Sequence, residues 1–213
     1  MIVAELWRYP VKSMAGERLR QVELLPDGIR GDRLVQAYDA RGRIVTARTR
    51  PGLLKHRATL GPDGQPLVDG RRWDAPEVGR DVEAAAGSGA RLAKGSADAR
   101  FDVLPLLVAT DGAIEAFGHD GRRLRPNLVI GGVEGLAERE WEGRLLRAGH
   151  CLIAMHALRQ RCVMTTFDPD TLEQDMGVLR RIVREFDGAL ALDCAVVRGG
   201  LVSVGDPAEV LST

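Results

Sequence analysis

Short apolar segments separated by glycine- and aspartate-containing turns run through the first part of the chain. Four of them predict β-strands, at Ile2–Tyr9, Leu19–Leu25, Leu34–Asp39 and Ile44–Thr46. The run Gly61–Gly64, Gly-Pro-Asp-Gly, is typical of a hairpin turn. We therefore expect the N-terminal half to be rich in β-structure.

The second half carries longer apolar runs that also predict strands. Leu128–Ile130 and Leu145–Leu158 are two of them. Ala189–Val197 and Leu201–Val204, joined by Arg-Gly-Gly, predict a closing hairpin. The β-rich pattern thus continues to the end of the chain.

Two helices are expected among these strands. Thr110 or Asp111 can cap a short helix that ends near Gly118. Asp175 can cap a second helix, with Gly188 after its end. The apolar stripe of this second helix is expected to face the core and consists of Met176, Leu179, Val183 and Phe186.

A change of composition marks the middle of the chain. Ala84–Ser96 is rich in alanine, glycine and serine, and we expect it to be a surface connection. A boundary near Asp98 then divides the chain into an N-terminal subdomain of residues 1–97 and a second domain of residues 98–213.

Composition excludes several classes of protein. The 213 residues are 45% hydrophobic, enough to bury a substantial core, and 30 basic side chains balance 30 acidic ones. No overall field therefore favours nucleic acid or an anionic membrane. No apolar run approaches the roughly 20 residues that span a bilayer, and the first residues read as a strand. We expect a soluble cytoplasmic protein with neither nucleic-acid nor membrane partners.

The three cysteines are Cys151, Cys162 and Cys194, an odd number at wide spacings. This pattern fits neither a disulfide framework nor a zinc site of paired cysteines, so reduced thiols are expected. Cys151 opens an apolar segment, and Cys194 shares strand parity with apolar neighbours. Both are expected in the core.

The segment around Cys162 has the composition of a site. Arg159 and Arg161 flank the thiol, and nearby positive charge favours the nucleophilic, metal-binding thiolate. A structural interpretation is also open, because Leu158, Cys162 and Met164 share the parity of one strand face. Local chemistry leaves both interpretations standing.

A family resemblance favours the site. Arg161–Thr171, Arg-Cys-Val-Met-Thr-Thr-Phe-Asp-Pro-Asp-Thr, resembles the signature of the molybdenum cofactor sulfurase C-terminal (MOSC) domain family, particularly its amidoxime-reducing branch. Further matching segments follow the family's order over nearly the whole chain: Tyr9–Gly16, Gly28–Arg33, Val45–Arg48, Phe101–Thr110, Arg125–Ile130 and Val204–Pro207.

The resemblance implies a mainly β architecture. A β-barrel MOSC core with few helices would pack against an N-terminal β-barrel subdomain, with a cofactor in the cleft between them. This expectation agrees with the β-rich pattern of the sequence.

The cofactor implied is the molybdenum cofactor, a pterin that carries a phosphate and a dithiolene bound to molybdenum. Cys162 matches the family's protein ligand to the metal, a role that suits a soft thiolate. Asp168 matches a carboxylate near the metal and is a second candidate catalytic residue, although Asp168–Thr171 also has ordinary turn chemistry. Candidate cofactor-binding residues match other family positions and are Lys12, Ser13, Arg33, Arg48, Arg125, Asn127 and Thr166.

The activity implied is molybdenum-dependent reduction of N-hydroxylated compounds such as amidoximes and hydroxylamines. The sequence offers no convincing flavin, nicotinamide or iron–sulfur motif. We therefore expect a separate electron donor of the ferredoxin, flavodoxin or cytochrome type. His56, His119, His150 and His156 match none of the motifs and receive no role.

Other functions remain open at this stage. Cys162 could carry a persulfide in a sulfur carrier or sulfurtransferase, the chain could bind molybdopterin without turnover, or it could be a structural β domain with an inert thiol. Two residues depart from the amidoxime-reducing pattern. Arg159 stands where those relatives often have a second cysteine, and Leu172 stands where they usually have glycine.

Overall fold

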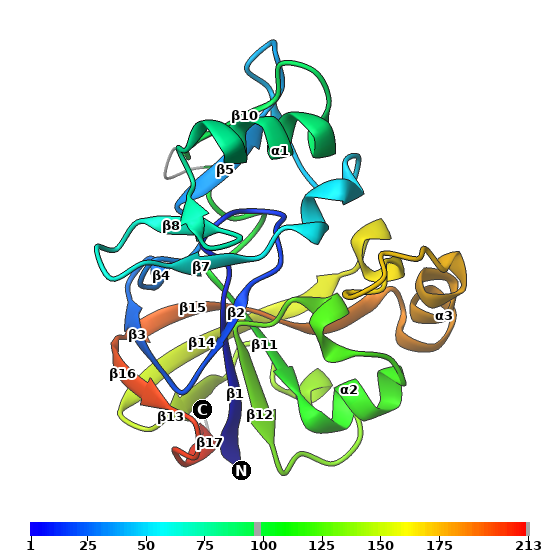
Figure 1. Cartoon of the computed structure of the whole chain (residues 1–213). Coiled ribbons are helices and arrows are strands. Elements are labelled where there is room, and N and C mark those ends of the chain that lie inside the picture. Colours follow the sequence, from blue (N-terminus) through cyan, green and yellow to red (C-terminus); the bar gives the residue numbers. More distant parts are fainter. Residues whose placement is uncertain (96–98, 212–213) are drawn as a thin grey trace.

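An eight-stranded sheet dominates the lower half of the molecule in the computed structural model, which describes residues 1–95 and 99–211 (Figure 1). Its strands are, in spatial order, β17 (Ala208–Leu211), β13 (Leu145–Ala148), β14 (Cys151–Gln160), β15 (Ala189–Arg198), β11 (Leu106–Thr110), β12 (Leu128–Gly131), β1 (Ile2–Arg8) and β2 (Glu17–Leu19).

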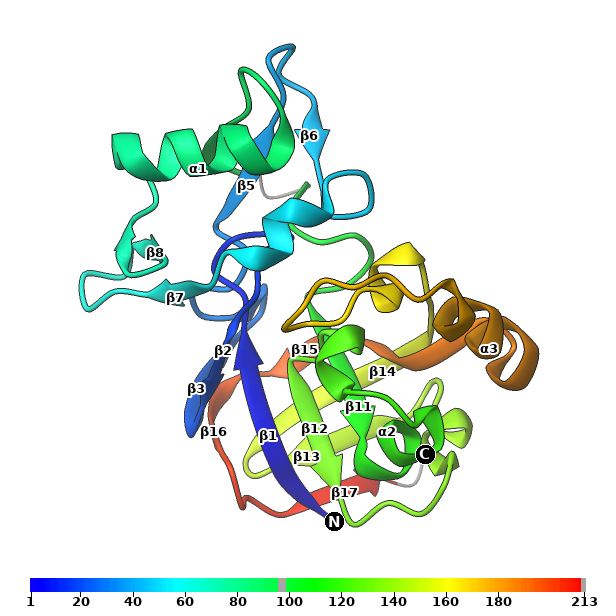
Figure 2. The same ribbon diagram turned by 45° about the vertical axis from the view of Figure 1, so that its right-hand side comes forward.

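The sheet curves until β1, next to the strand at one end, meets the chain at the start of β17, the strand at the other end. Ile2 forms a β-bridge with Pro207, and the amide of Val3 donates to the Asp206 carbonyl at 2.9 Å. In both views β1 and β17 come together near the N-terminus (Figures 1 and 2). Alternate side chains from these strands fill the interior, where Leu6, Val108 and Ile130 are fully buried.

A helical crossover joins the parallel strands β11 and β12. It contains α2 (Asp111–Phe117) and η3 (Gly121–Leu124). The Thr110 hydroxyl caps α2 by accepting from the Ala113 amide at 3.1 Å, and Gly118 ends the helix with a left-handed backbone. Both predicted ends of this helix are confirmed.

The upper half builds a second core from short elements. β5 (Val35–Tyr38) lies between β6 (Ile44–Val45) and β10 (Arg91–Lys94), and β7 (Ala58–Leu60), β8 (Pro66–Val68) and β9 (Arg71–Arg72) form another small sheet. η1 (Pro51–Lys55) and α1 (Pro76–Ala86) pack onto this core through buried Leu53, Val78 and Val82. The predicted turn at residues 61–64 does join two antiparallel strands, β7 and β8.

The expected surface connection at Ala84–Ser96 is wrong over its described residues, which end at Gly95. Ala84–Ala86 form the last turn of α1, where alanine has the highest helix propensity. Arg91–Lys94 form β10, which pairs with β5. Pro76 at the first helical position supplies a start signal that the alanine-rich composition masked.

The third helix, α3 (Met176–Phe186), starts where expected but turns a different face to the core. The Asp175 carboxylate caps it by accepting from the Gly177 amide at 2.7 Å. Val178, Ile182 and Phe186 are buried. Met176 and Val183, two members of the predicted stripe, are exposed by 40% and 60%.

The expected closing hairpin is also wrong, because β15 has no pairing with β16 (Gly200–Ser203). β16 pairs instead with β3 (Gln21–Leu25), which in turn pairs with β4 (Gly28–Ile29). A Cβ at Gly199 would lie 2.3 Å from the Leu24 carbonyl oxygen, so glycine allows the chain to approach β3.

The mainly β fold class with few helices is confirmed. The four expected N-terminal strands are present as β1, as β2 with β3, as β5 and as β6, although β1 and β2 belong to the eight-stranded sheet. The proposed boundary between residues 97 and 98 lies outside the described residues and stays a prediction.

Candidate active site

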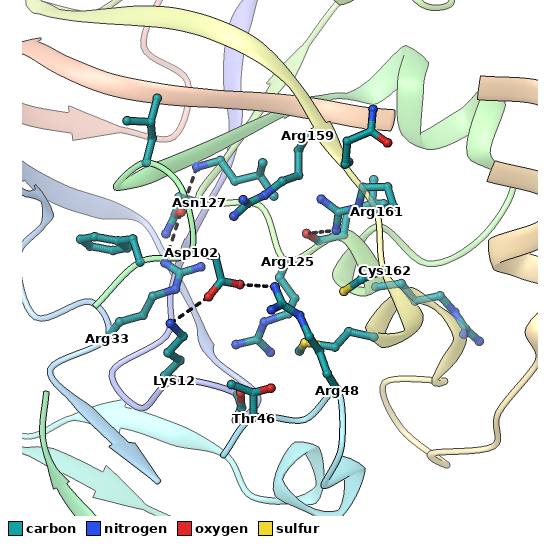
Figure 3. A pocket seen from close by; sticks show the side chains of 18 residues that line it. Lys12, Arg33, Thr46, Arg48, Asp102, Arg125, Asn127, Arg159, Arg161 and Cys162 are labelled. Atoms are coloured by element: carbon teal, nitrogen blue, oxygen red, sulfur yellow. Dashed lines mark hydrogen bonds and ion pairs between the residues drawn. The ribbon is translucent and has the colours of Figure 1, made fainter. Parts of the chain in front are cut away.

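A cavity of about 100 Å³ lies between the upper half and the barrel (Figure 3). Both halves contribute to it. The upper half supplies residues of the β1–β2 loop, the segment between β4 and β5, and the segment after β6, and the rest come from β11 and the segment before it, from η3 to the start of β12, and from the end of β14 and the residues after it. The residues that line it are Lys12, Ser13, Arg33, Thr46, Arg48, Phe101, Asp102, Leu104, Leu107, Arg123, Leu124, Arg125, Asn127, Arg159, Gln160, Arg161, Cys162 and Met164.

The lining is strongly cationic although the chain as a whole is neutral. Seven of the lining residues are basic and one, Asp102, is acidic. Acidic partners from outside the lining pair with three of the seven: Asp32 with Arg33, Asp168 with Arg123 and Asp193 with Arg159. The remaining positive charge in the lining would favour an anionic group.

Asp102 links cations from the upper half. Its carboxylate lies 2.8 Å from Lys12 Nζ and 2.6 Å from an Arg48 nitrogen, as Figure 3 shows. Burial acts to raise the pKa of Asp102, but Lys12, Arg48 and Arg159 outweigh it, and the pKa is lowered. Asp102 therefore stays ionised and holds both side chains at the cavity.

Cys162 lies two residues beyond the end of β14, at the start of η5 (Val163–Thr166). The Thr165 amide and hydroxyl donate to the Cys162 carbonyl at 3.0 and 2.9 Å, which fixes the backbone and leaves the thiol uninvolved in capping. The half-buried side chain lines the cavity, so Cys162 does not belong to a strand face as parity allowed.

Arg48 is the cation that faces this thiol (Figure 3). Burial acts to lower the pKa of Arg48, but Cys162 and Asp102 outweigh that effect and the pKa is raised. The guanidinium therefore stays charged beside the sulfur.

Arg125 and Arg161 line the cavity, and the surrounding protein encloses their side chains. Burial lowers the pKa of each to about 10, so both remain protonated near neutral pH. The Arg125 guanidinium lies 4.2 Å from the centre of the Tyr9 ring, and an Arg161 nitrogen donates to the Leu124 carbonyl at 2.7 Å. Arg161 Nε is buried without a partner in the described part of the chain, as is Arg123 Nε.

Asn127 acts as a hub of buried hydrogen bonds. Its Oδ1 accepts from the Leu107 amide at 3.1 Å, and its Nδ2 donates to the Trp7 carbonyl and the Asp32 carboxylate, each at 3.3 Å. Arg33 also approaches Oδ1, at 3.5 Å. Asn127 lines the cavity, but its polar atoms hold β1, β11 and Asp32 together.

Two predicted site residues lie outside the lining. Asp168 accepts from the amides of Asp170 and Thr171 at 3.0 and 2.9 Å and pairs with Arg123 at 3.0 Å. Thr166 is fully buried and donates to the Val163 carbonyl at 2.6 Å. Both shape the loop beside the cavity. The other seven predicted residues do line it: Lys12, Ser13, Arg33, Arg48, Arg125, Asn127 and Cys162.

Sequence reasoning gave no role to several lining residues, including Asp102, Arg123 and Thr46. The sequence signal for Asp102 was its position in Phe101–Thr110, one of the segments that resemble the family. Arg159, a departure from the family pattern, is anchored by Asp193 with 3.3 Å between Nε and Oδ1.

Two kinds of feature are absent from residues 1–95 and 99–211. No three His, Cys, Asp or Glu side chains are grouped so that they alone could hold a metal ion. Within the same ranges no helix is long and apolar enough to cross a membrane.

Comparison with known proteins defines the class. A model described as "MOSC N-terminal beta barrel domain" matches residues 1–101, and one described as "MOSC domain" matches residues 112–209. The chain belongs to the MOSC family, which is associated with the molybdenum cofactor.

Its relatives are distant. The chain is 27% identical over 227 residues to mitochondrial amidoxime reducing component 2 of Macaca fascicularis, covering 79% of this chain and 67% of the relative. It is 27% identical over 237 residues to mitochondrial amidoxime-reducing component 1 of Homo sapiens, covering 84% and 68%. The crystal structure of the YUAD protein from Bacillus subtilis shares the fold, with a TM-score of 0.54 and 15% identity over 99% of this chain and 95% of that one.

Proposed function

We propose that this protein binds the molybdenum cofactor in the cavity, with Cys162 as the protein ligand to the metal, and reduces N-hydroxylated compounds such as amidoximes and hydroxylamines. The observation that carries the proposal is the thiol of Cys162 beside a cluster of cations contributed by both halves. The amidoxime-reducing relatives support the reaction class.

The residues present fit this cofactor. Its phosphate needs cationic donors, and Arg161 Nε and Arg123 Nε are buried at the cavity without a partner among the described residues. Its metal takes a soft ligand, which the thiolate of Cys162 provides. Lys12, a compact charge with three donors, is half-buried at the same cavity.

Each residue has a distinct role in the proposal. Lys12, Ser13, Arg33 and Arg48 would hold the cofactor from the upper half, and Arg125 from the barrel. A bound cofactor would supply the two electrons for cleavage of the N–O bond, and the oxygen would leave as water with two protons taken from solvent. Arg48 faces the Cys162 sulfur, and Asp102 keeps Arg48 and Lys12 in place.

Asp168 and Thr166 contribute to the site indirectly, because neither lines the cavity. Asp168 is a positioning residue that orients Arg123, which does line the cavity. Thr166 and Asn127 fix the surrounding backbone. This assignment replaces a direct part for Asp168 in proton transfer.

Electrons would come from a separate donor protein of the ferredoxin, flavodoxin or cytochrome type, because the sequence carries no convincing motif for a second redox centre. A cytoplasmic location stays a prediction.

The test is the molybdenum and pterin content of wild-type protein and two variants, all purified from a host that makes the cofactor. Cys162→Ser replaces a soft ligand by a hard neutral one and should abolish metal retention with the fold intact. Cys151→Ser is the matched control, because Cys151 is buried away from the cavity and a hydroxyl there can donate to the Leu201 carbonyl.

We expect near-stoichiometric molybdenum and benzamidoxime reduction with a chemical electron donor in wild type and Cys151→Ser, and neither in Cys162→Ser. Retention of metal and activity by Cys162→Ser would refute the ligand assignment. Absence of cofactor from wild type, together with a persulfide on Cys162, would instead identify a sulfur carrier.

A further inference from the structure

A second, larger cavity adjoins the first. Its volume is about 570 Å³, within the range of roughly 300–1,000 Å³ typical of small-molecule pockets. Arg123, Arg125 and Met164 line both cavities and form the partition between them. A molecule in the larger cavity would therefore lie next to the cavity that contains Cys162.

One part of the wall is apolar and aromatic. Trp7 and Tyr9 from β1 and its end, Phe167 after η5, and Leu172 line it. The indole of Trp7 is oriented by its N–H, which donates to Glu5 at 2.7 Å. Such a wall suits the face of a flat ring.

Leu172 adopts a backbone conformation that rarely suits leucine. Its φ is +61°, in the left-handed region that glycine occupies without strain. The leucine side chain lines the larger cavity. A strained residue at a pocket wall points to a use for its side chain in binding.

The rim of the larger cavity carries cations that the protein leaves uncompensated. Six of its lining residues are basic, and Asp170 is the acid among them. Three of the basic side chains have carboxylate partners: Arg18 with Glu5 at 3.0 Å, Arg122 with Asp170 at 2.7 Å and Arg123 with Asp168 at 3.0 Å. Lys55 and Arg57 are exposed and form no ion pair within the described ranges. An anionic group on the ligand would neutralise Lys55 and Arg57.

Building on the function proposed above, we propose that the larger cavity is the substrate pocket and that it selects aromatic N-hydroxylated compounds that carry a carboxylate. The ring packs between Trp7 and Leu172, and the carboxylate lies toward Lys55 and Arg57. The N-hydroxylated group then points toward the partition at Met164 and Arg125.

The test compares the binding of 4-carboxybenzamidoxime and benzamidoxime to the purified protein by calorimetry at low salt. Wild type should bind the carboxylated ligand about tenfold more tightly, with the preference falling as salt rises. Lys55→Ala/Arg57→Ala should lose the preference. Arg20→Ala/Lys94→Ala, which removes two exposed cations outside both cavities, should keep it.

A second variant tests the apolar wall. Leu172→Gly relieves the left-handed strain, so its melting temperature should not fall, whereas its affinity for both ligands should drop about fivefold. Unchanged affinity in Leu172→Gly, or an equal preference in Lys55→Ala/Arg57→Ala and wild type, would overturn the assignment.

The binding readout separates the two proposals. Reduction of benzamidoxime without any effect of these variants on affinity or KM would leave the reductase standing and refute the pocket. The expected binding pattern in molybdenum-loaded protein that reduces neither ligand would support the pocket and refute the reductase.

Discussion

Lys12 and Asp102 form an ion pair, with 2.8 Å between Nζ and Oδ1, that joins the β1–β2 loop to the segment leading into β11. The same Lys12 ammonium donates to the Ala99 carbonyl at 3.0 Å. Two segments 90 residues apart in the sequence are thereby held at one wall of the cavity.

Asp102→Asn should destabilise the protein by about 1 kcal/mol at pH 7, because Lys12 and Arg48 lose a partly exposed carboxylate. The pKa of Asp102 is lowered in the folded state, so its contribution is present above its unfolded pKa, about 3.9, and is lost as pH falls through the folded pKa. Urea unfolding between pH 7 and 3 should show that the difference in unfolding free energy between wild type and Asp102→Asn decreases below about pH 4. Asp81→Asn removes the acid of the more exposed Arg71–Asp81 pair, so its difference from wild type in unfolding free energy should be smaller over the whole pH range.

Asn127→Ala should cost about 2 kcal/mol, because the Leu107 amide and the Trp7 carbonyl lose their buried side-chain partner. Urea unfolding monitored by tryptophan fluorescence measures the loss. A change below about 0.5 kcal/mol would show that these hydrogen bonds contribute nothing net to stability.

Arg159→Met should destabilise the protein by about 2 kcal/mol at pH 7, because the buried Asp193 carboxylate loses its cation. Burial raises the pKa of Asp193 against the opposing effect of Arg159 and Arg161, and removing Arg159 raises it further. Protonation of Asp193 then relieves the penalty, so the loss should shrink as pH falls. The double variant Arg159→Met/Asp193→Asn should recover most of the lost stability at pH 7. A coupling energy of zero between the two substitutions would contradict the pairing of Arg159 with Asp193.

Gly16→Ala should destabilise the protein by about 2 kcal/mol, because a Cβ there would lie 2.4 Å from the Arg8 carbonyl oxygen and 2.5 Å from the Tyr9 ring. Gly79→Ala provides the control. Gly79 lies inside α1 with nothing within 4 Å of an added Cβ, so alanine should raise stability by about 0.5–1 kcal/mol. Thermal unfolding of both variants checks the opposite signs.

Local signals predicted the elements whose determinants are local. The hydroxyl of Thr110 and the carboxylate of Asp175 marked helix starts correctly because a cap bonds to amides two or three residues away. The pairing of β16 with β3 was missed because those strands lie more than 170 residues apart and a glycine-containing turn between β15 and β16 imitates a hairpin.

The same contrast between local and long-range determinants applies to the candidate site. The flanking arginines indicated Cys162, the family resemblance indicated Lys12 and Arg48, and the structure brings all three to one cavity. The sequence alone could not indicate that Asp168 lies outside the lining and pairs with Arg123, or that Asp102 pairs with two cations. Both facts depend on chain segments that meet only after folding.

The position of β1 in the barrel has a consequence for synthesis on the ribosome. β1 leaves the exit tunnel before the other strands of the barrel, yet it pairs with β12, at residues 128–131, and forms a bridge with Pro207. At translation rates of roughly 5–20 residues per second, about 200 further residues take on the order of 10–40 s. Until β12 emerges within that interval, β1 has only β2 to pair with, so the nascent chain carries an open sheet edge that a ribosome-bound chaperone can protect.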